Sequence, residues 1–268
     1  MPLPRLQLFE LEDQAWFPRI VRDLATDYLH FMSERFALHR PIVPVLADLL
    51  RRTGATRIVD LCAGGAGPVP ALAAALAADG ARVDFVLTDL YPNLSAWEAV
   101  AAAGAPVRSV AVPVDARAVP DTLTGLRTIF NGFHHFAPHD AIAVLRDAAR
   151  QGQPIAIFEY PDRRLRLLPA YGIVTPFVVL AVTPWIRPFR WRRLALTYLV
   201  PLVPLTCWWD GLVSTLRAYT PEELAALADA VGVDGYAWEA GRIEVASPPA
   251  RLTYLLGHAT DGAPSTSA

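Results

Sequence analysis

The chain has 268 residues, enough for one large domain or for one domain with an insertion. A formal net charge of −2 predicts no nucleic-acid partner, and the sequence has no lysine, which excludes Schiff-base and P-loop lysine chemistry. The two cysteines, Cys62 and Cys207, lie too far apart to indicate a disulfide framework or a metal site. Residues 1–12 include acids and do not resemble a signal peptide, so we expect a cytoplasmic protein.

Residues 10–54 predict an N-terminal cap of two helices. Apolar residues recur at helical spacing over 20–32 and again over 41–52, and Gly54 is the expected stop signal of the second helix. In the simpler interpretation both helices cover a sheet. In the alternative, side chains of this region line the pocket of a cofactor or acceptor, and the candidates for that role are Trp16, Arg22 and Tyr28.

The first predicted strand ends in an acid, Asp60, and is followed by a glycine-rich turn and a helix over Val69–Ala78. Glycine lets the backbone turn sharply and lets a ligand approach it. The start of a helix offers unpaired N–H groups. This pattern is typical of a nucleotide-type site at the first crossover of an α/β sheet. The residues predicted to surround such a ligand are Asp60, Cys62, Ala63, Gly64, Gly65 and Gly67.

Residues 58–68 resemble the first motif of the class I S-adenosylmethionine-dependent methyltransferases, in which an apolar strand and an acid precede glycines at alternate positions. In that family the loop wraps the methionine part of the cofactor. Two of the family's glycine positions hold Cys62 and Ala66 here. The resemblance implies S-adenosylmethionine as cofactor and a doubly wound, mostly parallel seven-stranded α/β sheet of the Rossmann-like methyltransferase type.

The second strand, over 83–87, is followed by Asp89 and Leu90. A carboxylate at this strand end can accept hydrogen bonds from both hydroxyls of a ribose. The alternative is an aspartate that only forms the turn before Pro92. Asp89 lies about 25 residues beyond the glycines, a separation that favours the ribose role.

A third strand is expected over 110–114, ending at Asp115 and Ala116. In the family that this chain resembles, the corresponding position often holds an acid that contacts the adenine amine. The resemblance therefore implies that these two residues bind the cofactor. The alternative is that Asp115 only caps a helix.

The fourth strand, over 126–130, ends at Asn131 and is followed by His134 and His135. In the resembling family the tail of this strand faces both the cofactor and the acceptor, which implies that Asn131 contacts the cofactor. Imidazole titrates near neutrality and can remove a proton from an acceptor. Adjacent side chains on an extended stretch face opposite ways, so we expect only one histidine to reach the acceptor. The alternative is that the histidines only pack or bind the backbone.

Residues 161–218, after the fifth strand (155–158), interrupt the resemblance with an apolar, helical insertion. Two nearly uncharged stretches, 171–186 and 194–209, are shorter than the roughly 20 residues of a membrane span and contain proline. Arginines lie before and between them: Arg163, Arg164, Arg166, Arg187, Arg190, Arg192 and Arg193. Two interpretations stay open. The insertion is a lid that forms an apolar acceptor pocket, or residues 163–209 dock peripherally on an anionic membrane surface.

Three further residues around the insertion are predicted to contact the acceptor. Tyr160 follows the fifth strand, and Asp210 and Arg217 lie near the end of the insertion. Arg217 would hold a carboxylate acceptor through two hydrogen bonds. A structural ion pair is the alternative for Arg217.

The resemblance resumes over 219–258. Thr220 is a predicted N-cap with Glu223 three residues on, a capping-box pattern. Two strands, 236–245 and 251–257, then predict the antiparallel hairpin that ends a class I methyltransferase sheet. Residues 259–268 are expected to be a disordered tail.

These features together predict a methyltransferase that acts on a small or apolar acceptor. We expect the methyl group to be transferred to the oxygen of a hydroxyl or carboxylate. Two other functions stay open. A nicotinamide-dependent oxidoreductase shares the glycine loop and the strand-end acid. A degenerate cofactor fold would serve only as a non-catalytic membrane-docking module.

Overall fold

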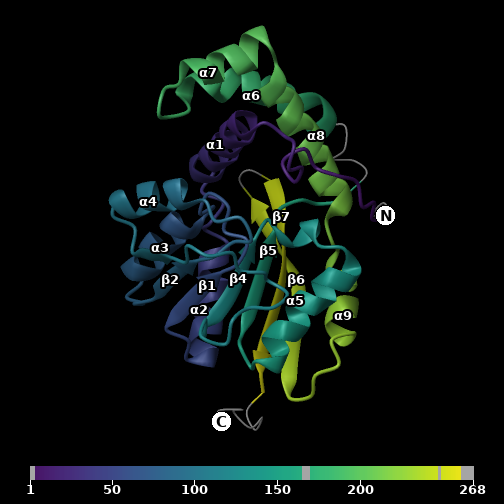
Figure 1. Cartoon of the computed structure of the whole chain (residues 1–268). Helices are drawn as coiled ribbons and strands as arrows, with labels where there is room; N and C mark the ends of the chain where they lie inside the picture. The colour runs from purple at the N-terminus through teal and green to yellow at the C-terminus, as the bar shows by residue number, and fades with distance from the viewer. Residues whose placement is uncertain (1–3, 165–169, 247–248, 261–268) are drawn as a thin grey trace. The chain divides into compact units, whose positions relative to one another are not determined.

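The computed structural model describes residues 4–164, 170–246 and 249–260 (Figure 1). The chain divides into two compact units. Residues 1–36 and 161–219 form the first, here called the helical unit, and residues 37–160 and 220–268 form the second, the sheet unit. The apolar insertion thus belongs to the same unit as the N-terminal residues. Arg166 and residues 261–268 of the expected tail lie outside the described residues.

The sheet unit contains a seven-stranded sheet in the order β3-β2-β1-β4-β5-β7-β6. Strands β1 to β5 pair in parallel, and β7 pairs antiparallel with both β5 and β6. The strands are β1 (Arg57–Asp60), β2 (Asp84–Leu87), β3 (Val107–Ser109), β4 (Leu126–Phe130), β5 (Ile155–Glu159), β6 (Tyr236–Ala246) and β7 (Pro249–Ala259). An antiparallel β7 inserted between β5 and β6 is the topology of the class I methyltransferase fold. The predicted fold class is therefore confirmed.

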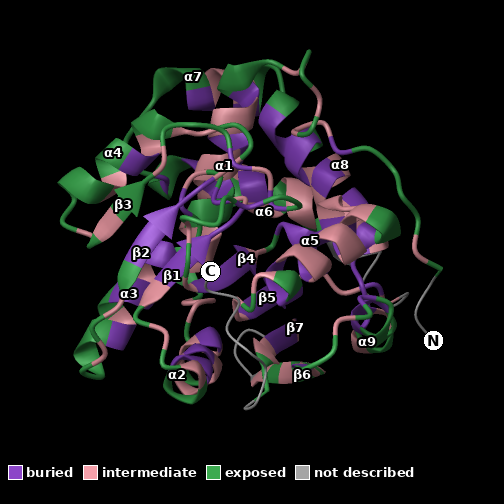
Figure 2. Ribbon diagram, turned by 60° about the horizontal axis from the view of Figure 1, so that its bottom comes forward, coloured by how far each residue is buried: buried purple, intermediate pink, exposed green. Residues whose placement is uncertain are grey.

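Helices cover the two faces of this sheet. Helices α2 and α3 pack together on one side of it, and α5 and α9 pack together on the other (Figure 1). The helices are α2 (Ile42–Thr53), α3 (Val69–Ala78), α4 (Leu94–Ala102), α5 (Pro138–Arg150) and α9 (Pro221–Asp229). Every residue of β5 is buried, as expected of a parallel strand between two helical layers (Figure 2).

Two predicted helix boundaries are confirmed. Gly54 ends α2 in the left-handed conformation, with φ of 65°. The Thr220 hydroxyl accepts a hydrogen bond from the Glu223 N–H, and the Glu223 carboxylate accepts one from the Thr220 N–H. This reciprocal pair is the predicted capping box at the start of α9.

The third strand lies earlier than expected. Strand β3 ends at Ser109, whereas the sequence pattern favoured residues 110–114. Pairing with β2 continues through one more hydrogen bond, from the Val110 N–H to the Leu87 carbonyl (3.0 Å). It cannot run on through Pro113, because proline has no N–H to donate. The expected strand position is therefore wrong by about one strand length.

The helical unit packs α1 against α8, and α8 against α6. Its elements are α1 (Arg19–Arg35), the π-helical turn η3 (Ala170–Val174), α6 (Thr175–Val182), η4 (Thr183–Trp185), α7 (Trp191–Leu194), the π-helical turn η5 (Ala195–Leu199) and α8 (Leu202–Arg217). Its small apolar core joins Val21, Leu24, Ala25 and Tyr28 of α1 to Val179, Ile186, Val203 and Cys207.

Among the described helices none is, by itself, long and apolar enough to cross a membrane. One pair, Trp191–Leu199 with Leu202–Arg217, reaches that length and composition together, with a bend of 75° between its two parts.

Candidate functional site

Strands β1, β2, β4 and β5 are parallel neighbours, so their carboxyl ends lie at one edge of the sheet. The chain order reverses between β1 and β4, because β2 and β3 follow on one side and β5 on the other. Open α/β sheets bind ligands at this kind of switch point. Asp60, Asp89, Asn131 and Tyr160 all lie at or just beyond these strand ends. The fold therefore brings the predicted sheet-unit candidates to one edge.

The loop after β1 keeps the backbone that its motif requires. Cys62, Gly64, Ala66 and Gly67 have φ values of 59°, 50°, 75° and 40°. A left-handed conformation costs an ordinary residue about 1–2 kcal/mol. Cys62 and Ala66 adopt it nevertheless, at the two positions where the resembling family has glycine. The loop therefore has four left-handed residues, of which only Gly64 and Gly67 are glycines.

Hydrogen bonds tie this loop to β2 and α4. The Ala63 N–H donates to the Thr88 carbonyl (3.0 Å), and the Gly64 N–H donates to Asp89 Oδ2 (2.9 Å). The indole N–H of Trp97 donates to the Gly64 carbonyl (2.9 Å). A Cβ atom built on Gly64 or on Gly67 would meet no described atom within 4 Å. Three hydrogen bonds therefore fix the loop, and space remains beside the Cα atoms of Gly64 and Gly67. This space suits a ligand that passes close to the backbone.

Asp60 lies beneath the loop and is buried. The Thr128 hydroxyl donates to Asp60 Oδ1 (2.8 Å), and the Thr88 hydroxyl donates to the Asp60 carbonyl (3.0 Å). Burial raises the pKa of the Asp60 carboxyl to about 8, against which the Thr128 hydrogen bond acts only in part. Burial thus favours the protonated form of Asp60.

Asp89 stands at the end of β2 and is partly exposed. Its two oxygens accept hydrogen bonds from the backbone, Oδ2 from Gly64 and Oδ1 from Tyr91 (2.8 Å). These N–H donors fix the direction of the carboxylate. The neighbouring side chains of Leu90 and Tyr91 are exposed.

Asp115 forms an ion pair with Arg117, whose guanidinium donates to both carboxylate oxygens (2.8–3.2 Å). Hydrogen bonds from Arg117 lower the pKa of Asp115, so this carboxylate is charged at neutral pH. Arg117 also reaches Asp140 (2.9 Å). Ala116, between the pair, is buried.

His134 and His135 lie on the 3-10 turn η1 (Phe133–His135), and their ring centroids are 4.4 Å apart. The expectation that they face opposite ways is wrong, because successive residues of a 3-10 turn differ by about 120° in direction rather than 180°. His134 is buried, and its Nδ1 lies 2.5 Å from Glu159 Oε2. The other Glu159 oxygen accepts the Phe133 N–H (2.6 Å).

Asn131 links the ends of β4 and β5. It has φ of 50°, and its Oδ1 accepts a hydrogen bond from the Tyr160 N–H (2.8 Å). The Tyr160 hydroxyl donates to the Leu38 carbonyl. Both side chains therefore have partners within the sheet unit.

The sequence reasoning missed four residues at this edge: Trp97, Arg117, Thr128 and Glu159. Glu159 carried a usable signal, since it ends an apolar strand as Asp60 does. Trp97 and Thr128 carried none, because their hydrogen-bond partners lie 33 and 68 residues away.

Five predicted acceptor residues belong to the helical unit, where three of them hold the N-terminal segment. Arg22 donates to the carbonyls of Glu12 (2.9 Å) and Gln14 (2.8 Å). Asp210 accepts the N–H groups of Leu11 (2.6 Å) and Glu12 (3.1 Å), and burial raises the pKa of Asp210 to about 6. Their role toward an acceptor stays a prediction.

Arg217 lies 3.3 Å from Glu10 and 2.8 Å from Asp13 and is buried. The structural ion pair left open for this residue is therefore present. Tyr28 is buried in the core of the helical unit, and burial raises the pKa of its hydroxyl. Trp16 is exposed and meets Phe17 edge to face, with ring centroids 6.0 Å apart.

No protein-family model matches the chain, and a search of curated proteins finds no match. Solved structures that resemble it include an O-methyltransferase family protein from Burkholderia thailandensis, with 18% identity, a TM-score of 0.45 and coverage of 84% of this chain and 57% of that one. The mitomycin 7-O-methyltransferase MmcR gives 18% identity, a TM-score of 0.44 and coverages of 76% and 49%. PigF with SAH gives 16% identity, a TM-score of 0.49 and coverage of 92% of this chain and 63% of that one.

This chain spans between about half and just under two thirds of the length of these three proteins. At such low identities the fold assignment rests on the strand order of the sheet. The chain has the fold of a class I methyltransferase.

Proposed function

We propose that this protein transfers a methyl group from S-adenosylmethionine to a small acceptor molecule. The observation that carries the proposal is the loop after β1. Its left-handed positions are kept at Cys62 and Ala66 at an energetic cost, its front is open, and the Asp89 carboxylate is fixed beside it. Gly80 also has an open left-handed backbone, so the feature that distinguishes this loop is the Asp89 carboxylate, which follows a strand end and accepts the Gly64 N–H.

The residues at this edge fit the cofactor part by part. The backbone at Gly64 and Gly67 would lie along the methionine part, where a Cβ atom would meet nothing. Asp89 would accept the ribose hydroxyls, and the charged Asp115 would accept the adenine amine. When bound, S-adenosylmethionine supplies a methyl group carried on a positively charged sulfur.

His134 is the proposed general base. If Nδ1 of His134 carries the ring proton, the Glu159 carboxylate accepts it, and Nε2 is then the basic nitrogen of the ring. Glu159 is itself held by the Phe133 N–H, so the ring orientation is fixed from the backbone outward. Removal of a proton from a hydroxyl acceptor as its oxygen attacks the methyl carbon is the step that such a base serves. We therefore propose transfer to oxygen.

Calorimetric titration of the purified protein tests the cofactor. S-adenosylmethionine and S-adenosylhomocysteine should bind, and NADH should not. Binding of NADH alone would favour the oxidoreductase. Failure of all three ligands to bind would favour a fold that has lost its cofactor.

Gly64→Val locates the site. The added side chain would fill the open space in front of the loop, so binding of S-adenosylmethionine should be lost. The matched control is Gly80→Val, because Gly80 also has a positive φ (84°) and no described neighbour within 4 Å but lies between α3 and β2. Equal loss of binding in both variants would mean that backbone strain, rather than a blocked site, is responsible.

Asp89→Ala should weaken cofactor binding by about 1–3 kcal/mol, the usual value of hydrogen bonds to a charged group. Calorimetry measures the change directly. Unchanged affinity would contradict the ribose role.

His134→Ala should leave S-adenosylmethionine affinity intact and slow turnover about 10²–10⁴-fold, the range of general base catalysis. A panel of small hydroxyl and carboxylate compounds, with release of S-adenosylhomocysteine as the readout, identifies the acceptor first. Wild-type turnover by the variant would exclude His134 as the base.

A further inference from the structure

The helical unit displays alternating aromatic and arginine side chains over residues 185–192, here called the docking segment. Trp185 is 65% exposed and Trp191 is 76% exposed, and Phe189 between them is exposed as well. The arginines that alternate with them, Arg187, Arg190 and Arg192, are also exposed. Large apolar rings and guanidinium groups thus share one short stretch of surface.

A buried arginine holds this segment in place. Arg193 donates to the carbonyls of Ile186 and Pro188 (both 2.9 Å) and pairs with Asp27 of α1. Ile186 packs into the apolar core of the unit. Hydrogen bonds to Arg193 and the packing of Ile186 therefore fix the backbone of the segment. The neighbouring rings are exposed in this fixed conformation.

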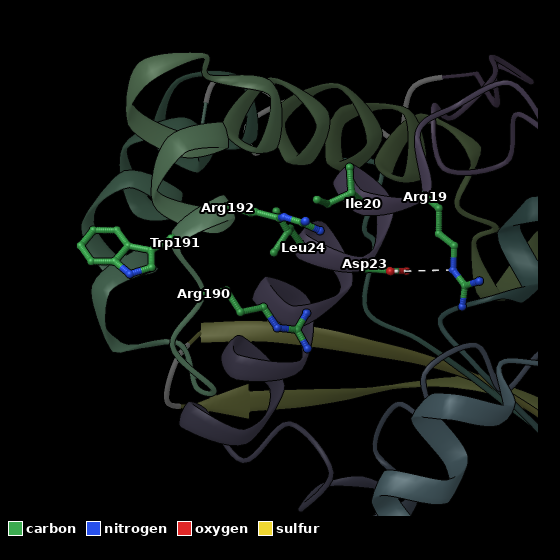
Figure 3. Close-up of a pocket in the computed structure, with 7 residues that line it drawn as sticks. All are labelled: Arg19, Ile20, Asp23, Leu24, Arg190, Trp191 and Arg192. Carbon is green, nitrogen blue, oxygen red and sulfur yellow. Dashed lines mark ion pairs between the residues drawn. The ribbon is translucent and has the colours of Figure 1, made fainter.

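One hollow beside the docking segment is cationic. It has a volume of about 620 Å³ and is lined by Arg19, Arg190 and Arg192 together with the apolar side chains of Ile20 and Leu24 (Figure 3). Asp23 contributes a carboxylate, which lies 3.9 Å from Arg19. In Figure 3 the indole of Trp191 points away from the guanidinium groups of Arg190 and Arg192.

A second hollow, at the Trp185 end of the segment, is apolar. Its volume is about 490 Å³, and it is lined by Phe31, Met32, Phe36, Val178, Val182 and Trp185, with Arg35 contributing the one cation among its described lining residues. The docking segment thus has a hollow lined by arginines at one end and an apolar hollow at the other.

We propose that the docking segment binds the protein peripherally to an anionic lipid surface. Its three rings lie at the boundary between headgroups and acyl chains, where tryptophan is favoured. Arg187 and Arg192 face lipid phosphates, whereas Arg190 is paired with Asp27 of α1 (3.0 Å). The apolar bend between η5 and α8 adds exposed side chains of the same kind: Tyr198, Leu199, Val200, Leu202 and Leu205.

Charge favours a lipid surface over a second copy of the chain. Residues 163–209 contain seven arginines and neither aspartate nor glutamate. In a two-fold dimer the same patch meets itself, so the exposed arginines of the docking segment would face arginines. An anionic bilayer offers phosphates to Arg187 and Arg192, whereas Arg193 is buried and Arg190 pairs with Asp27. The inference goes beyond methyl transfer, because docking requires neither the cofactor nor the loop after β1.

The test measures cosedimentation of the full chain with vesicles of phosphatidylcholine alone and of phosphatidylcholine with 30% phosphatidylserine. Binding is expected on the anionic vesicles and is expected to fall between 0.15 M and 0.5 M NaCl, because salt screens the arginines. The double variant R187Q/R192Q should bind anionic vesicles about 30-fold more weakly, since each arginine near such a surface contributes about fivefold.

This variant should keep the fold, because within the described part of the chain neither the Arg187 nor the Arg192 side chain makes a hydrogen bond or ion pair. The matched control is R82Q/R150Q, which removes the same charge from exposed positions of the sheet unit. The control should bind as the wild type does. A second variant, W185S/W191S, should lose binding while keeping both arginines.

Three results would overturn the proposal. The wild type stays in solution with both vesicle types, the control loses as much binding as R187Q/R192Q, or sedimentation velocity shows a dimer that W185S/W191S abolishes while no vesicle is bound. Calorimetry with S-adenosylmethionine on the same variants should give wild-type affinity, which separates failure of docking from failure of the proposed methyl transfer.

Discussion

The two units place their large apolar side chains in opposite ways. Among its described residues the sheet unit exposes only Leu90, Tyr91, Leu94 and Val112, all near the carboxyl ends of β2 and β3. The helical unit exposes rings and aliphatic chains along most of its elements, while Arg193 and Arg217 are buried in it. The sheet unit therefore buries its apolar side chains more completely, while buried arginines occur in both units, Arg193 and Arg217 in the helical unit and Arg127 in the sheet unit.

We therefore expect different substitutions to destabilise the two units. A helix or strand that is covered by apolar layers loses stability mainly when a helix cap is removed or a cavity is created in the core. A unit that is held by buried charges loses most when one partner of a pair is removed, because the other charge is left in a poorly solvated place. The following substitutions test this contrast.

The largest effect is expected for Arg217→Met in the helical unit. The change removes the guanidinium that lies 3.3 Å from the buried carboxylate of Glu10, and loss of one partner of a buried pair costs about 3–5 kcal/mol. Urea denaturation measures the free energy of unfolding. The matched control is Arg127→Met in the sheet unit, where the partner Asp147 reaches solvent and the loss should be smaller. Equal losses of stability in the two variants would contradict the expected difference between the two units.

The next effect concerns pH and the sheet unit. Burial raises the pKa of Asp60 from 3.8 to about 8, so the folded state holds a proton that the unfolded state has released. This contribution to stability is fully present below pH 4 and is lost as pH rises through 8, by up to about 1.4 kcal/mol per pH unit.

Asp60→Asn keeps the acceptor for Thr128 and removes the titration. Between pH 5 and pH 7.5 the wild type should therefore lose more stability than the variant in urea denaturation. Burial also raises the pKa of Glu12 in the helical unit, to about 8, and the variant leaves that contribution unchanged. Parallel pH profiles for the two proteins would show that Asp60 is ionised in the folded state.

The smallest effect is expected for Thr220→Ala, which removes the N-cap of α9 and should cost about 1 kcal/mol. The control is Thr53→Ala, whose hydroxyl only donates back to the Leu49 carbonyl within α2 (2.8 Å). Thermal denaturation compares the two. A larger loss in the control would mean that the cap contributes little to the sheet unit.

Features set by neighbouring residues could be predicted from the sequence. The capping box at Thr220, the stop at Gly54 and the alternation of strands with helices all depend on residues a few positions apart. The position of β3 could not, because it depends on pairing with β2, whose residues lie more than twenty positions away and which itself ends at Leu87.

The same limit applies to the candidate site. The acid at Asp89 and the loop at Gly64 were visible as a motif, but the partner of His134, Glu159, lies 25 residues away and depends on how separate segments meet. Arg217 illustrates the point most clearly, since its carboxylate partners are more than 200 residues away. A sequence pattern can identify a charged side chain there but cannot say whether it faces a ligand or another residue.

The placement of the two cysteines has a practical consequence. Cys62 belongs to the loop of the sheet unit and Cys207 to the core of the helical unit, and burial raises the pKa of both thiols. Alkylating reagents attack the thiolate, so the buried Cys207 should react only when the helical unit opens, whereas the partly exposed Cys62 is also within reach in the folded sheet unit. Mass spectrometry of the Cys207 peptide would then follow the opening of the helical unit in the native chain, with no probe added.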